Sequence, residues 1–352
     1  MTERRAPAGL SRRQALWAGG AALWPGLVPA QTHTPRRPLI RARRLQPGDT
    51  LGLVNPSGAI YERQPYELAR DSLSALGFRV REGANARARR GHLAGTDAQR
   101  AADLNALFAD PGIQGILAIT GGSGGGRILP LLDYELIQRN PKVLCGFSDL
   151  TSVINAIHTR TGLVTFHAPM AASEWNEFSV QQFRGVLMDA QALTLRNPPP
   201  GTEVLAPREG RISTRRPGRA SGPLLGGNLA VLTALAGSPW WPLFDGAILC
   251  LEEVNEYIYR VDRMLSTLKL SGALDRVAGI VLGAFTNCTP GEGFGTLTLD
   301  EVFDDYFAPL NVPVYGGASF GHIRRKFTLP IGLPVEMDAD AGTLRLLQPA
   351  VL

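Results

Sequence analysis

Cysteine is scarce in this chain of 352 residues, which has only Cys145, Cys250 and Cys288. An odd number without metal-type spacing excludes a disulfide framework. Cys145 and Cys250 lie inside apolar runs, where a free cysteine is usually a small buried residue. The fold must therefore depend on its hydrophobic core, and the apolar content of 44% is ordinary for a globular protein.

Long apolar runs and strong charge are missing as well. No stretch after residue 30 is long enough to span a bilayer, so the mature protein is expected to be soluble. The net charge of +5 falls to +2 without residues 1–30, which carry four arginines and one glutamate. No basic and aromatic platform accompanies this charge, which argues against nucleic-acid binding. The length favours two domains, because single cores rarely grow beyond about 250–300 residues.

The N-terminus has the parts of an export signal. Arg12 and Arg13 precede a short apolar run from Ala15, and Val28-Pro29-Ala30 offers a small-residue cleavage site. Paired arginines after a serine resemble a twin-arginine signal, although Ala15 stands where that signal usually has a bulky apolar residue. An ordinary secretory signal remains the alternative. Residues 1–30 are therefore predicted to be a signal peptide, cleaved near Ala30, of a periplasmic or otherwise exported protein.

Strand and helix patterns alternate after Asp49, which predicts an α/β fold with a parallel sheet and helices on both faces. The expected strands and helices of the N-terminal α/β domain, residues 45–194, are Thr50–Val54, Tyr66–Leu76, a helix from Thr96 to Phe108, Ile113–Thr120, Ile128–Gln138, Val143–Phe147 and Leu150–Thr159.

A stretch rich in proline and arginine, residues 195–222, interrupts the alternation and is predicted to link two domains. The C-terminal domain would then cover residues 223–352. It is expected to contain strands at Ala247–Leu251 and Gly279–Phe285, helices at Tyr259–Leu270 and after Thr298, and a β-rich end.

Ser148 is the first candidate for chemistry. The apolar strand before it runs directly into the serine, and a helix begins directly after it. A sharp strand-to-helix turn exposes a nucleophilic hydroxyl and directs backbone N–H groups to the same point, so the backbone of Asp149 could donate to an oxyanion. Leu150 stands where the common elbow motif has glycine, and an ordinary helix N-cap is the alternative.

A glycine-rich loop, residues 120–127, lies between another strand and helix. It matches neither a dinucleotide-binding fingerprint nor a P-loop, because the required glycine and lysine are missing. The functional interpretation is a second oxyanion donor, the backbone N–H of Gly122. A flexible turn without a function is the alternative.

A catalytic serine needs a base and an acid that orients it. The five histidines are His33, His92, His158, His167 and His322. His322 follows a glycine and a β-like run, which would leave its ring exposed, whereas His158 and His167 fit structural positions. Glu252 and Glu253 end a buried strand, where a sheet presents catalytic groups, although a solvated strand end would look the same.

These segments, in this order, resemble the LD-carboxypeptidases, a serine peptidase family that includes murein tetrapeptide carboxypeptidases and microcin-immunity peptidases. The resemblance implies a Ser148, His322 and Glu252 triad, in which Glu252 is preferred to Glu253 because the acid directly follows the strand's last apolar residue. It also implies a flavodoxin-like N-terminal domain, a smaller, swivelling, β-rich C-terminal domain, a homodimer, and no metal or cofactor. The matching segments are Pro47–Asp49, Asn55–Gly58, Ala94–Arg100, Gly121–Arg127, Gly146–Thr151, Thr165–His167, Gly226–Leu229, Leu251–Val254, Tyr259–Arg263 and Gly321–His322.

The expected reaction is hydrolysis of an L-to-D amide bond, with release of terminal D-alanine from a murein tetrapeptide. Thr120 and Ser123 replace an arginine and a tyrosine that are frequent in the family, so substrate preference at the loop stays open. Hydrolysis of aminoacyl-nucleotide antibiotics is one alternative, for which Trp175 could stack on a base. A non-catalytic periplasmic binding protein is another.

Overall fold

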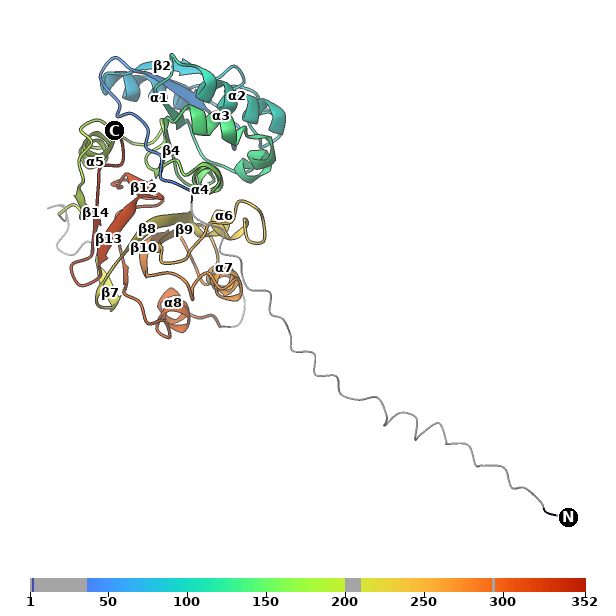
Figure 1. The fold of residues 1–352 in the computed structure, drawn as a ribbon, viewed down its shortest axis with the longest axis vertical. Helices are drawn as coiled ribbons and strands as arrows, with labels where there is room; N and C mark the ends of the chain where they lie inside the picture. Colours follow the sequence, from blue (N-terminus) through green and yellow to red (C-terminus); the bar gives the residue numbers. More distant parts are fainter. Residues whose placement is uncertain (1, 3–36, 200–209, 293–294) are drawn as a thin grey trace. The chain divides into compact units, whose positions relative to one another are not determined.

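The structure is a computed structural model that describes residues 2, 37–199, 210–292 and 295–352. Its compact unit runs from Arg36 to Leu352, and all the elements described below belong to it (Figure 1). The predicted signal peptide lies outside the described residues, apart from Thr2. Within the described part, no helix is long and apolar enough to cross a membrane.

The first sheet has six strands in the order β12-β5-β4-β3-β1-β2. All neighbours from β2 to β5 are parallel, and the order 2-1-3-4-5 is that of flavodoxin-like folds. β12 comes from the C-terminal part of the chain and pairs with β5 in the antiparallel direction. The predicted α/β fold is therefore confirmed. The strands are β1 (Thr50–Val54), β2 (Arg79–Glu82), β3 (Gly115–Ala118), β4 (Val143–Gly146), β5 (Thr165–His167) and β12 (Leu329–Ile331).

Helices connect the parallel strands, because a parallel pair needs a long crossover connection. Thr96 caps α2 with a full capping box, in which its hydroxyl accepts from the Gln99 N–H and the Gln99 side chain accepts from the Thr96 N–H. The helix predicted at Ile128–Gln138 is instead a 3₁₀ helix at Gly125–Leu131 followed by α3, because Asp133 caps a new helix after Pro130. The α-helices are α1 (Gln64–Ala75), α2 (Asp97–Ala109), α3 (Tyr134–Arg139), α4 (Leu150–Thr161) and α5 (Glu177–Leu187).

The second sheet has eight strands in the order β6-β14-β13-β8-β9-β10-β11-β7. Its central strands β8 to β11 are parallel, and the outer strands are antiparallel. The strands are β6 (Thr194–Leu195), β7 (Ser213–Arg216), β8 (Arg219–Asn228), β9 (Ile248–Val254), β10 (Gly279–Thr286), β11 (Val314–Gly316), β13 (Pro334–Asp338) and β14 (Thr343–Leu346).

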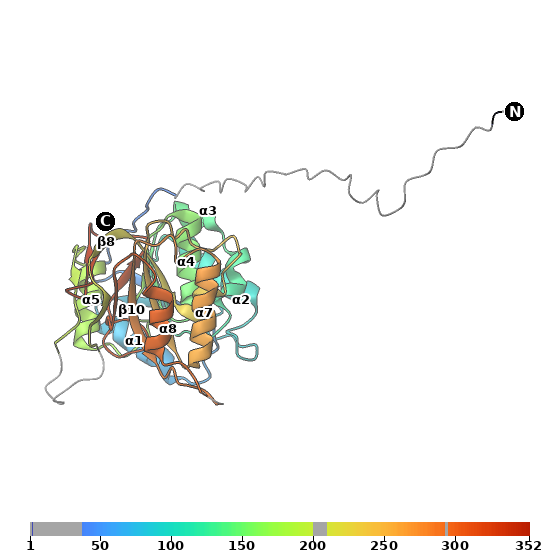
Figure 2. The same ribbon diagram turned by 90° about the horizontal axis from the view of Figure 1, so that it is seen from below.

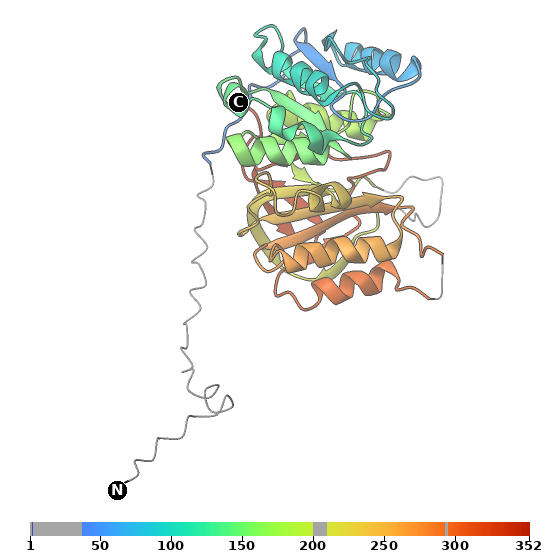
Figure 3. The ribbon, with the colours of Figure 1, turned by 90° about the vertical axis from the view of Figure 1, so that its right-hand side faces the viewer.

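Three helices accompany this sheet: α6 (Leu229–Thr233), α7 (Ile258–Leu270) and α8 (Leu299–Phe307). Figures 2 and 3 show α7 and α8 side by side along it. Of the predicted linker, residues 195–222, the described part includes β7 and the start of β8, while residues 200–209 lie outside the description. The domain boundaries stay a prediction.

Candidate active site

Ser148 occupies a tight turn between β4 and α4. Its φ of +61° is unusual for a residue with a side chain and is a form of strain that concentrates at functional sites. Gly146 permits the turn, because a Cβ there would lie 2.7 Å from the side chain of Leu150. The Thr151 N–H donates to the Ser148 carbonyl at 2.9 Å, which begins the helix. The backbone therefore has the geometry of a nucleophile elbow.

A chain of hydrogen bonds joins Ser148, His322 and Glu252. His322 Nδ1 lies 2.8 Å from Glu252 Oε2, and His322 Nε2 lies 3.0 Å from Ser148 Oγ. In the neutral tautomer with its proton on Nδ1, the imidazole donates to the carboxylate and accepts from the serine hydroxyl. Glu252 is fully buried and His322 is one-fifth exposed, so the ring can be reached from solvent while its partner cannot.

The side chains of Glu252 and Glu253 lie on opposite faces of β9. This strand continues to Val254, three residues beyond its predicted end at Leu251. Glu253 accepts hydrogen bonds from Asn228 Nδ2 at 2.9 Å and from the N–H groups of Ala230 and Val254 at 2.8 Å. Burial raises the pKa of the Glu253 carboxyl. Glu253 therefore connects β9 to the β8–α6 turn, and the contact with His322 is made by Glu252.

Gly321 and Phe147 fix the position of the His322 ring. A Cβ at Gly321, which has a φ of +106°, would lie 2.8 Å from Glu252 Oε2. The Phe147 ring packs against the imidazole edge to face, with centroids 5.0 Å apart. His167 packs on the same phenylalanine at 5.8 Å and is buried, and burial lowers its pKa to about 3. A ring that stays neutral and makes no hydrogen bond to the serine fits a structural position.

The other histidines lie elsewhere. His158 belongs to α4, where its Nδ1 lies 3.0 Å from the Leu163 carbonyl. His92 lies in a loop between β2 and α2, where its carbonyl accepts from the Ala59 N–H. His33 is outside the described residues.

The glycine-rich loop follows β3 and passes beside the serine. A Cβ at Gly121 would lie 3.0 Å from Ser148 Cβ and 3.1 Å from its Oγ. Gly122 has a φ of +118°, and a Cβ there would lie 2.8 Å from the Gly58 Cα. Among the described residues, no group accepts a hydrogen bond from the N–H of Gly122 or of Asp149. The loop therefore needs glycine for close backbone approach, and both N–H groups remain available to a ligand.

Two buried charged side chains hold this loop. The side chain of Arg100 is fully buried, donates to the Gly124 carbonyl at 2.8 Å and to the Pro56 carbonyl, and forms an ion pair with Asp97. Asp149 Oδ2 accepts from the Gly125 N–H at 2.6 Å, and burial raises the pKa of this carboxyl. Neither side chain could be assigned this role from the sequence, because burial of a charge depends on tertiary packing.

A cavity of about 350 Å³ opens next to His322. It also reaches Lys326, a buried residue with no predicted role, and Glu174. It is lined by Ile119, Thr120, Phe147, Met170, Ala172, Ser173, Glu174, His322 and Lys326. The cavity places a cation and polar groups within reach of a molecule held by the serine and histidine.

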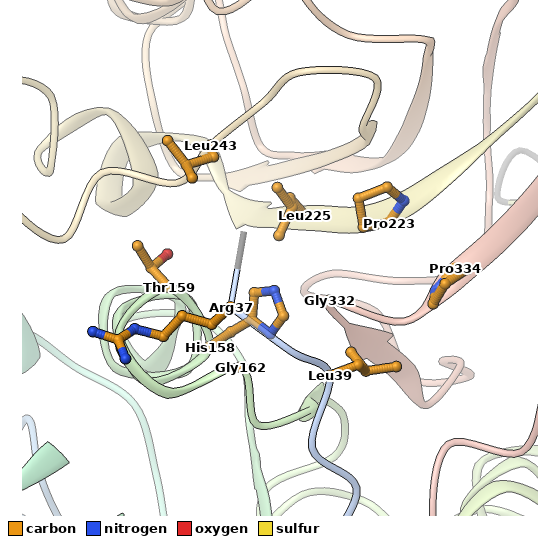
Figure 4. A pocket seen from close by; sticks show the side chains of 10 residues that line it. All are labelled: Arg37, Leu39, His158, Thr159, Gly162, Pro223, Leu225, Leu243, Gly332 and Pro334. Carbon is orange, nitrogen blue, oxygen red and sulfur yellow. The ribbon is translucent and has the colours of Figure 1, made fainter. Parts of the chain in front are cut away.

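Other cavities lie away from His322. One of about 470 Å³ lies across the glycine-rich loop and is lined in part by Ser123, Asp149 and Trp240. Another of about 190 Å³ lies between α4 and β8, next to Arg37, and contains no member of the Ser148, His322 and Glu252 group (Figure 4). Among the described residues, no three His, Cys, Asp or Glu side chains are grouped closely enough to hold a metal ion.

Comparison with known proteins identifies both parts of the chain. Residues 51–168 match the LD-carboxypeptidase N-terminal domain, and residues 221–337 match the C-terminal domain. The chain is 39% identical to a putative carboxypeptidase of Streptomyces coelicolor, over 90% of this chain and 98% of that protein. It is 33% identical to a probable murein peptide carboxypeptidase of Bacillus subtilis, over 86% and 93%. It is 32% identical to a murein tetrapeptide carboxypeptidase of Pseudomonas aeruginosa, over 82% and 93%.

A solved structure agrees with this result. The structure of MccF in complex with glutamyl sulfamoyl guanosine superimposes with a TM-score of 0.80 at 27% identity, over 90% of this chain and all of that chain. The two domain matches and the long, full-length similarities lead to one conclusion: this chain belongs to the LD-carboxypeptidase family.

Proposed function

We propose that this protein is a serine carboxypeptidase that hydrolyses an L-to-D amide bond and releases terminal D-alanine from murein tetrapeptides. The hydrogen-bond chain from Ser148 through His322 to Glu252 is the observation that carries the proposal. A serine hydroxyl 3.0 Å from an imidazole that a buried carboxylate orients is the arrangement that activates serine as a nucleophile. The names of the Bacillus and Pseudomonas relatives support murein peptides as the substrate class.

In the first half-reaction, Ser148 Oγ attacks the carbonyl carbon of the scissile amide and His322 Nε2 takes the hydroxyl proton. Glu252 stabilises the imidazolium that forms and keeps the Nδ1 proton in place. His322 then gives its proton to the departing amine of D-alanine as the carbon–nitrogen bond breaks. A water molecule, deprotonated by the same nitrogen, attacks the acyl-enzyme and restores Ser148.

The N–H groups of Gly122 and Asp149 would stabilise the oxyanion of each tetrahedral intermediate. Gly122 follows β3 and Asp149 follows the serine after β4, so both proposed donors come from neighbouring strand ends of the first sheet. Loss of one such donor typically lowers kcat by about 10²–10³. Arg100 acts as a positioning residue, because its hydrogen bond to the Gly124 carbonyl restrains the loop that carries Gly122.

Hydrolysis of aminoacyl-nucleotide compounds is the second candidate, favoured by the structural similarity to MccF. Trp175, which was considered for base stacking, gives this second candidate little support. Trp175 Nε1 donates to the Ala171 carbonyl at 3.1 Å, and its ring packs edge to face on Phe183 at 5.1 Å. These contacts are those of a packing residue.

The test is to incubate the protein from Gln31 onward with a purified disaccharide tetrapeptide and to follow D-alanine by mass spectrometry. Ser148→Ala is the matched control, because it removes one oxygen atom. We expect release by the wild-type protein and none by the variant. Release that persists in Ser148→Ala would refute the assigned nucleophile. No release by the wild type, with cleavage of an aminoacyl sulfamoyl nucleoside, would replace the murein substrate by the second candidate.

We also propose that the protein is exported through the signal at residues 1–30 and works as a homodimer. Export would bring the enzyme to murein where the polymer is made and remodelled. Fractionation of cells with an antibody to the C-terminus, combined with N-terminal sequencing, tests cleavage near Ala30. Light scattering of the purified protein tests the dimer.

A further inference from the structure

Lys326 is a buried lysine in the cavity beside His322. It is 7% exposed, and its Nζ lies 4.0 Å from the centroid of the Phe147 ring, the same ring that packs on the imidazole. Its backbone N–H donates to Ser179 Oγ at 3.1 Å, which anchors the residue next to α5. The ammonium group therefore lies over the ring that packs on the imidazole, and the backbone of Lys326 is anchored by Ser179.

This ammonium has no carboxylate partner within 4.0 Å among the described residues. Glu174, which lines the same cavity, is instead paired with the exposed Arg324 through Nε and Oε2 at 2.8 Å. Glu252 attracts the ammonium from a distance, yet burial lowers the Lys326 pKa to about 8. Burying a cation without a close anion is costly, and a buried group with a shifted pKa in a cavity is a candidate for a functional role.

The leaving group has the matching chemistry. In a terminal D-alanine, one carbon atom separates the amine that receives a proton from the carboxylate. His322 Nε2 delivers that proton under the proposed mechanism, so a group that recognises the carboxylate must line the same cavity as the imidazole. Among the described residues that line it, Lys326 and His322 are the only two that can carry a positive charge.

We propose that the Lys326 ammonium binds the terminal carboxylate of the peptide substrate and so restricts the enzyme to carboxypeptidase action. The inference rests on the proposed function, and it names the specificity determinant of that site. Phe147 contacts both groups, the imidazole in an edge-to-face arrangement and the ammonium over its ring, so one ring helps to set the spacing between the proton donor and the carboxylate-binding group.

The experiment compares two substrates, a tetrapeptide with a free C-terminal carboxylate and the same peptide as a C-terminal primary amide. Lys326→Met is the test variant, and Lys142→Met is the matched control. Lys142 is equally buried at 7% exposure, but its ammonium donates to the Leu107 carbonyl at 2.8 Å, outside the cavity. We expect Lys326→Met to lower kcat/KM for the free acid by about 10- to 150-fold, the range of one charge-assisted hydrogen bond, and to leave the amide nearly unchanged.

An equal loss on both substrates would overturn the proposal, because it would give Lys326 a purely structural role. Lys142→Met is expected to keep the wild-type ratio between acid and amide. A wild-type enzyme that cleaves neither peptide would contradict the proposed function itself, which is a separate failure.

The wild-type enzyme offers a test that does not depend on a folded variant. The ammonium is present below its pKa of about 8 and is lost as the pH rises through that value. The kcat/KM for the free acid should therefore fall above about pH 8, because this constant reports the free enzyme. The amide should show no such fall. The same alkaline fall for both substrates would contradict the proposal.

Discussion

Replacing Glu252 by glutamine tests the proposed role of its carboxylate in orienting His322, with the least change in side-chain shape. The carboxylate is fully buried and its Oε2 lies 2.8 Å from His322 Nδ1. Among the described residues, Oε1 has no hydrogen-bond partner, so nothing there fixes the orientation of a glutamine amide. If the amide donates to Nδ1, the imidazole takes the wrong tautomer and cannot accept from Ser148. If the amide oxygen faces Nδ1, the negative charge is still lost.

The size of the effect follows from these contacts. Loss of a hydrogen bond to a charged group costs about 1.5–3 kcal/mol. We take loss of the stabilised imidazolium to cost a similar amount, which gives about 3–6 kcal/mol in all. At 1.36 kcal/mol for each factor of ten, kcat should fall by about 10²–10⁴. KM should change little, because neither Glu252 nor its partner atom contacts the bound peptide.

Glu253→Gln is the matched control, one residue along the same strand. Its amide would keep an oxygen for Asn228 and Val254 but would place an NH₂ group against the Ala230 N–H. We expect the free energy of unfolding, measured in urea, to fall by about 1–3 kcal/mol, with kcat within about threefold of wild type. A Glu253→Gln variant as inactive as Glu252→Gln, or an active Glu252→Gln, would refute the reasoning.

The remaining predictions concern glycines of the site. Gly122→Ala should lower kcat by about 10²–10³, because its Cβ would lie 2.8 Å from the Gly58 Cα and displace the oxyanion donor. Gly126→Ala is the control and should be active, because its Cβ meets nothing within 4 Å. Equal activity of the two variants would contradict the role of Gly122. Gly321→Ala should reduce kcat at least tenfold, because its Cβ would lie 2.8 Å from Glu252 Oε2 and its φ is +106°. Steady-state assays on the tetrapeptide measure both, and wild-type turnover by Gly321→Ala would show that the carboxylate tolerates displacement.

Local patterns predicted much of the first sheet. The strand expected at Thr50–Val54 has those bounds, and Thr96 caps α2, because an apolar strand and a helix cap are properties of neighbouring residues. The helix expected at Tyr259–Leu270 is α7, with one residue more at its start. The break inside Ile128–Gln138 was missed, although Pro130 and Asp133 are present in the sequence as signals for it.

Local sequence patterns also predicted only part of the candidate active site. Ser148 could be found from its position between a strand and a helix, whereas its contact with His322 spans 174 residues and no local pattern contains it. Lys326 and Arg100 could not be predicted as buried charges, because their neighbours come from distant parts of the chain. The pairing of β12 with β5 could not be predicted either, because a strand from the C-terminal part of the chain forms the edge of the first sheet.

The pairing of β12 with β5 has a consequence for synthesis on the ribosome. Leu329 pairs with His167, and Leu352 donates a hydrogen bond to the Ala42 carbonyl and accepts one from the Arg44 N–H, near the start of the compact unit. A nascent chain that has already formed the serine turn still has an open β5 edge and lacks His322. A polypeptide shorter than 322 residues lacks the proposed general base, so the proposed group of Ser148, His322 and Glu252 can form only late in synthesis. Its unpaired edge is also a target for chaperones until then.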